Sequence, residues 1–229
     1  MRRCFLIVLF MLVLLCSLSL LCAETASDTQ HDAFRSAKNK RYNTGGEDLI
    51  APDKPGEERD RFVDHYWFRD FPLFPCSDSA VIVLGTLKKW ESFLSQDHSN
   101  LYTELTITAE EIFKDDMKHP QSGGSSVVAD LPGGVLRLAT GKVVRLGRPN
   151  QGPADLRVGT GYLLLLRPTH GGADLEVLRG FESVAGQVYG LISNGGTTFE
   201  SFRGVPENLT EERNFLKAAR EAVSGSSCK

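Results

Sequence analysis

The chain has 229 residues, of which 26 are basic and 29 acidic, and its net charge is −3. This balance argues against a nucleic-acid partner, because such proteins need a basic face that displaces counterions from phosphates. The length suffices for one domain with a hydrophobic core, or for one domain and a tail.

Residues 1–23 have the three parts of a secretory signal peptide. Arg2 and Arg3 give a positive start, an apolar run extends from Cys4 to Cys22, and Ala23 is a small residue before a polar sequence. We predict cleavage after Ala23 and export to the periplasm or the extracellular space. The alternative is an uncleaved membrane anchor, since the apolar run is about long enough to span a bilayer.

Residues 24–60 are polar and show no apolar periodicity. They contain nine acidic, six basic and only two aromatic residues. Too little apolar surface is present to offset the entropy lost on ordering. We therefore expect a disordered leader that tethers the domain away from the membrane.

Residues 61–75 are an aromatic-rich segment, and Pro72 and Pro75 favour an extended conformation for it. One interpretation is a plug that closes one end of a core, and the other is an exposed interaction surface. The candidate residues are Phe62, Tyr66, Trp67, Phe68, Phe71 and Phe74.

The pattern over residues 76–195 predicts a β domain. Ala80–Leu87 is a continuous apolar run, and Leu101–Ala109 alternates between apolar and polar residues with a strict period of two. Further strands are predicted at Ser126–Leu131, Val135–Ala139, Lys142–Leu146, Gly161–Arg167, Leu175–Phe181 and Gln187–Ile192. Short strands without intervening helices indicate an antiparallel sheet, and closure into a barrel would remove its exposed edges.

Residues 196–229 read as a linker and a C-terminal helix. Thr210 is a candidate N-cap, an apolar stripe includes Phe215 and Ala219, and Gly225 ends the pattern. We expect this helix to dock on the barrel and to bring Cys228 back toward the domain.

Only two cysteines, Cys76 and Cys228, lie outside the signal peptide. In an exported protein such a pair suggests one disulfide bond rather than a metal cluster. Two unpaired thiols, or a bond between two chains, remain alternatives.

Three short sequence motifs resemble those of a group of uncharacterised exported bacterial proteins. They also resemble the netrin-like, or tissue-inhibitor-of-metalloproteinases, barrel, which is a fold of the OB type. They are Cys76-Ser-Asp-Ser-Ala-Val-Ile-Val-Leu-Gly85-Thr, Glu110-Glu-Ile-Phe-Lys114 and Val158-Gly-Thr-Gly-Tyr-Leu-Leu-Leu-Leu166. The resemblance covers residues 76–192 and implies an OB-like barrel. Those inhibitors chelate zinc through a cysteine at the mature amino terminus, whereas Cys76 lies inside this chain, so the inhibitory residue does not carry over.

The sequence contains no catalytic, metal-binding or cofactor-binding motif that we recognise. It has no Gly-x-Ser-x-Gly, no His-Glu-x-x-His and no phosphate-binding glycine loop, and its five histidines have no fixed spacing. We therefore expect a non-enzymatic binding or interaction module of the cell envelope, whose partner is an envelope protein or an extracellular ligand. The alternative is a secreted hydrolase or metal-dependent enzyme with a site carried by loops.

Overall fold

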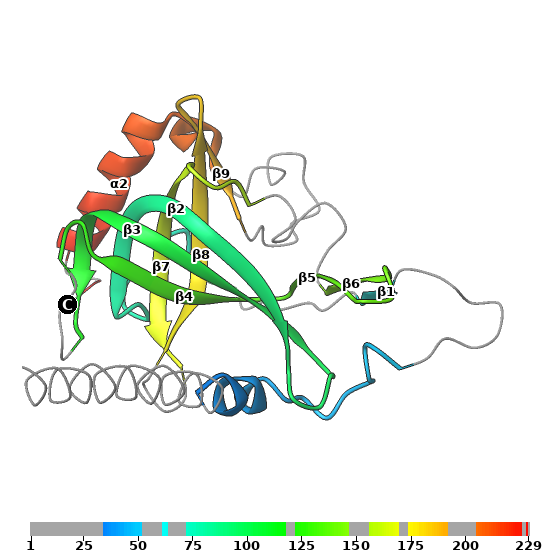
Figure 1. Ribbon diagram of the computed structural model, residues 1–229. Helices are drawn as coiled ribbons and strands as arrows, with labels where there is room; N and C mark the ends of the chain where they lie inside the picture. Colours follow the sequence, from blue (N-terminus) through cyan, green and yellow to red (C-terminus); the bar gives the residue numbers. More distant parts are fainter. Residues whose placement is uncertain are drawn as a thin grey trace, which may run out of the picture.

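The computed structural model (Figure 1) describes residues 34–51, 61–63, 72–117, 122–146, 156–169, 174–191, 205–225 and 228, with backbone only for 61–63. The chain is mostly β, with largely antiparallel pairing and a C-terminal helix, as predicted. Residues 1–23, for which a signal peptide was predicted, lie outside the described residues.

Five strands form a closed ring of pairings. They are β2 (Val81–Leu94), β3 (Leu101–Asp115), β4 (Ser126–Pro132), β7 (Gly161–Pro168) and β8 (Leu175–Val184). The pairing order is β4-β3-β2-β7-β8, and β4 closes the ring by pairing with β8 in parallel. β2 and β3 are longer than predicted. Both strands curve around the ring, and register shifts between them, one of which lies at Gly85, allow this bending.

The interior of the ring is the main hydrophobic core. The strict alternation predicted for β3 is confirmed, since Leu105, Ile107 and Ala109 are each 1% exposed and belong to this core. Aliphatic side chains of all five ring strands meet there. Side chains at the intervening positions therefore lie on the outer face of the ring.

Helix α2 (Glu212–Ser224) packs on the outer face of β7 and β8 after β9 (Gln187–Gly190) and the 3-10 helix η3 (Glu207–Leu209) (Figure 1). Its buried residues are Phe215 and Ala219. Glu211 rather than Thr210 occupies the N-cap position, and its side chain makes no capping hydrogen bond. The Thr210 hydroxyl donates to the Glu207 carbonyl.

Cys76 and Cys228 are brought together as predicted. The Cα atoms of Cys76 and Cys228 are 5.3 Å apart, and the two sulfur atoms are bonded. This disulfide joins the segment before β2 to Cys228, which follows α2 in the chain.

The aromatic-rich segment contributes to both a small sheet and a core. β1 (Arg61–Val63) pairs in parallel with β6 (Val143–Leu146), which pairs with β5 (Gly134–Arg137). The Phe74 ring centroid lies 5.2 Å from that of Phe215 and 6.1 Å from that of Phe181, so Phe74 belongs to the packing under α2 rather than to an exposed surface. The side chains of Phe62, Tyr66, Trp67, Phe68 and Phe71 lie outside the described residues.

The prediction of a disordered leader is wrong for residues 34–51. Residues 34–41 are helical, and Lys38 and Leu49 are only 1% and 2% exposed. Leu49 joins a third apolar cluster with Leu101 and the β5–β6 hairpin. The helix escaped detection because it docks through charged side chains, whereas the composition argument treats charges as solvated. The rest of the leader lies outside the described residues.

Candidate functional site

Three carboxylates lie side by side on the outer face of the ring. Glu104 of β3 is in register with Asp130 of β4, and Asp130 is in register with Glu176 of β8. They alternate with residues that fill the interior, which places all three on the outside. We call Glu104, Asp130 and Glu176 the carboxylate row.

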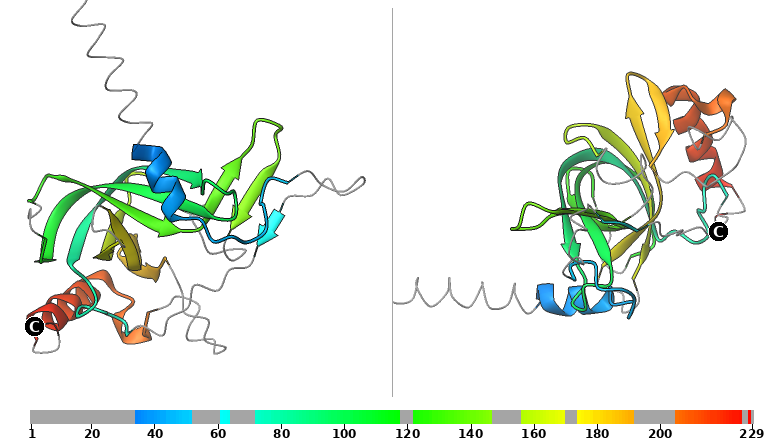
Figure 2. Two further views of the ribbon diagram at one scale, coloured as in Figure 1. Left: turned by 90° about the horizontal axis from the view of Figure 1, so that it is seen from below. Right: turned by 90° about the vertical axis from the view of Figure 1, so that its right-hand side faces the viewer.

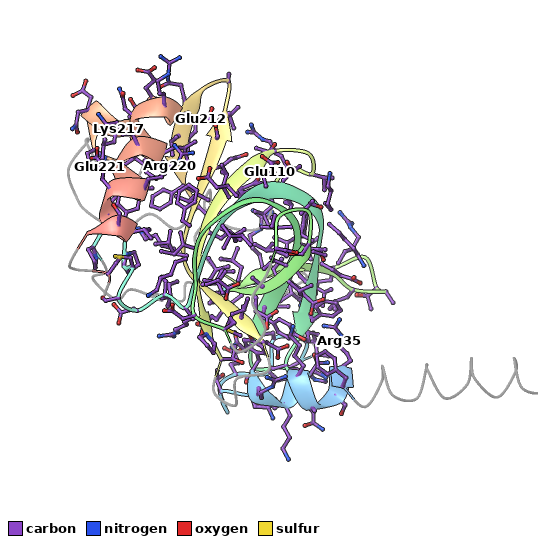
Figure 3. All side chains as sticks on the ribbon, turned by 90° about the vertical axis from the view of Figure 1, so that its left-hand side faces the viewer. Arg35, Glu110, Glu212, Lys217, Arg220 and Glu221 are labelled. Atoms are coloured by element: carbon purple, nitrogen blue, oxygen red, sulfur yellow. A yellow bond between two sulfur atoms is a disulfide. The ribbon has the colours of Figure 1, made fainter. Side chains whose placement is uncertain are left out.

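The 34–41 helix lies across this row and presents two cations to it and a third to nearby Asp174. Lys38 Nζ is 2.7 Å from carboxylate oxygens of both Glu104 and Asp130. One turn earlier Arg35 pairs with Glu104 at 3.0 Å, and one turn later Arg41 pairs with Asp174 at 2.5 Å. Spacings of three residues put these cations on one face of the helix. Figure 3 shows Arg35 where the helix meets the strands.

The pKa values of the buried ion pairs follow from burial and hydrogen bonding. Burial lowers the pKa of Lys38, but hydrogen bonds to Asp130 and Glu104 outweigh it and raise the pKa. Burial raises the pKa of Glu104, but hydrogen bonds from Lys38 and Arg35 reverse this and lower it. For Asp130 burial prevails, and its pKa is raised despite Lys38. Lys38 therefore stays charged and holds two carboxylates together.

Aromatic rings flank the ion pairs. Tyr42 stacks on Tyr102 with ring centroids 4.0 Å apart, and the Tyr42 hydroxyl donates to Asp130 at 2.7 Å. The Arg35 guanidinium lies 3.8 Å from the centroid of the Phe93 ring. Burial and the charge of Asp130 raise the pKa of Tyr42, which keeps this hydroxyl a hydrogen-bond donor.

An open cleft of about 640 Å³ adjoins the carboxylate row. It lies between the loop after the 34–41 helix and the ends of β4, β7 and β8. Arg167 of β7 pairs along its wall with the cross-strand neighbour Glu176 of β8 at 3.2 Å. The residues that line it are Arg41, Tyr42, Asn43, Thr44, Asn100, Pro132, Arg167, Pro168, Thr169 and Glu176. Its size is that of a small-ligand site, and its lining mixes charged, amide and hydroxyl groups with flat apolar surfaces.

The sequence-based predictions did not include the residues of this charged face. Of the aromatic candidates, the one with a described side chain, Phe74, lies under α2 instead. The missed signal was the three-residue spacing of Arg35, Lys38 and Arg41, which favours one basic helical face.

The described residues hold no group of three or more His, Cys, Asp and Glu side chains arranged to bind a metal ion. No helix within the described ranges is long and apolar enough to cross a membrane.

Comparison of the sequence with models of known families and with curated proteins gives no match.

Proposed function

We propose that this protein is an exported, non-enzymatic binding module of the cell envelope built on an OB-like barrel. The five-stranded ring closed by β4 and β8 supports this, because OB barrels are five-stranded Greek-key barrels. The resemblance of residues 76–192 to netrin-like barrels points the same way.

The observation that carries the proposal is the concentration of charged and aromatic side chains on one outer face beside an open cleft. OB barrels bind their ligands on the face of the second and third strands, which correspond here to β3 and β4. The carboxylate row crosses that face. A polar ligand of the envelope or the extracellular space fits the mixed lining of the cleft.

A capture experiment tests the binding function. The immobilised protein is exposed to an envelope extract beside two variants, Arg167→Ala in the cleft and Lys217→Ala on the exposed side of α2. We expect a component that the wild type and Lys217→Ala retain and Arg167→Ala loses. Identical captured sets for all three proteins would contradict the proposed site.

Export is tested separately by sequencing the amino terminus of the secreted protein. We expect it to begin at Glu24, because Ala23 ends the signal peptide. Finding Met1 retained in a membrane fraction would contradict cleavage and would show instead that the protein is anchored by an uncleaved segment.

A further inference from the structure

We propose that the carboxylate row is a docking site for a cationic peptide segment of a partner protein, and that residues 34–41 are its intramolecular occupant. This inference rests on the proposed binding function and specifies the chemistry of the partner. Figure 2 shows the 34–41 helix laid against the strands of the ring.

The helix is held by charge rather than by apolar contact. Within residues 34–41 the only buried side chain is Lys38, and Phe34, the one aromatic residue, is 48% exposed. Arg35 and Lys38 pair with the carboxylate row, Arg41 pairs with Asp174 just before β8, and Asn39 accepts a hydrogen bond from the Tyr102 hydroxyl at 2.6 Å. The face therefore holds its occupant through polar contacts, chiefly with cations at defined spacing.

The row itself requires a cation. Glu104 and Asp130 are opposite one another on neighbouring strands, where like charges destabilise a sheet. Asp130 is 1% exposed beneath the helix, so solvent cannot compensate its charge. A segment with Lys or Arg at successive turns of a helix supplies the missing charge at the positions now occupied by Lys38 and Arg35.

Release of the helix leaves the chain beyond it in place. Tyr42 is stacked on Tyr102, the Thr44 hydroxyl hydrogen-bonds Ser99, and Leu49 is buried in an apolar cluster. These contacts lie after the helix, so residues 34–41 can detach as a local unit without unfolding the ring. An external segment then competes with the 34–41 helix for the carboxylate row. Because a short covalent link joins this helix to the domain, its effective concentration at the row is in the millimolar range.

The experiment uses the full chain and a synthetic peptide with the sequence of residues 34–44. The variant Lys38→Glu repels its own helix from the row while leaving the row intact. We expect the peptide to bind Lys38→Glu at least about tenfold more tightly than the wild type, because the wild-type face is occupied. Binding should weaken as salt rises from low to high concentration.

Matched variants locate the interaction. A peptide with Lys38→Gln should bind the Lys38→Glu protein about tenfold more weakly, while a peptide with Lys40→Gln, changed at an exposed position, should bind as before. Adding Glu104→Gln to the protein should also weaken binding about tenfold. Circular dichroism verifies that each protein is folded.

Two results would overturn the inference. One is absence of peptide binding to folded Lys38→Glu protein, and the other is equal binding of the Lys38→Gln and Lys40→Gln peptides. Either result leaves the capture experiment with Arg167→Ala unaffected, so failure of the peptide inference is distinguishable from failure of the binding function.

Discussion

Two helices cover the outside of the strand ring, and they are attached by opposite means (Figures 1 and 2). Helix α2 buries Phe215 and Ala219 and is tied down by the Cys76–Cys228 disulfide. The 34–41 helix buries one lysine among carboxylates. Apolar burial is non-directional and tolerates changes of solution conditions, whereas an ion-pair network depends on geometry, salt and pH. The comparison indicates that α2 is a permanent part of the fold and the 34–41 helix an exchangeable one.

Loss of the disulfide should have the largest effect on stability. Its half-cystines are 152 residues apart in sequence, and for a loop of that length the chain-entropy model gives about 5 kcal/mol. We expect Cys76→Ser with Cys228→Ser to lower the free energy of unfolding by up to this amount, measured by chemical denaturation. An unchanged midpoint after reduction of the wild type would show that apolar packing alone holds α2.

Phe215→Ala should be next in size. Phe215 is 1% exposed and contacts Phe74 and Phe181, so truncation removes a large apolar surface and leaves a cavity. We expect a loss of about 4 kcal/mol in the free energy of unfolding, independent of salt. Arg213→Ala, at an exposed position of the same helix, is the control and should change stability by less than about 0.5 kcal/mol.

Lys38→Met should release the 34–41 helix and leave α2 attached. Removing the ammonium leaves Glu104 and Asp130 without their shared partner, which we expect to weaken docking by about 2 kcal/mol. Hydrogen exchange of the amides of residues 35–41 measures this loss. Lys40→Met should retain protection because Lys40 is exposed, and equal exchange in both variants would contradict a dominant role for Lys38.

Glu104→Gln should give the smallest effect and a defined pH dependence. The pKa of Glu104 in the folded protein is lowered below its ordinary value of 4.5, so the unfolded chain binds the proton more readily. The stability advantage of the wild type over Glu104→Gln, about 1 kcal/mol, should be complete above pH 4.5 and disappear as pH falls through the lowered pKa. Asp130 is present in both proteins and largely cancels from the difference. A stability advantage of the wild type that grows as the pH falls would contradict a lowered pKa for Glu104.

The elements that depend on local apolar pattern were predictable from the sequence. The alternation of Leu101–Ala109 specified the inner and outer faces of β3, and the apolar stripe of α2 predicted its docking surface. A bond between Cys76 and Cys228 was one of the alternatives that the sequence left open, and the structure brings the two together.

The closure of the ring and the assembly of the charged face were decided by tertiary structure. Asp130 reads as an ordinary polar position in β4 until the parallel pairing of β4 with β8 sets it beside Glu176 and the antiparallel pairing with β3 sets it beside Glu104. Lys38 reads as a solvated charge until those carboxylates meet beneath it. The sequence by itself determined which apolar residues leave water, because apolar periodicity is a local property. Charge pairing between residues 66 or more positions apart is a property of the folded chain, and only the tertiary structure decided it.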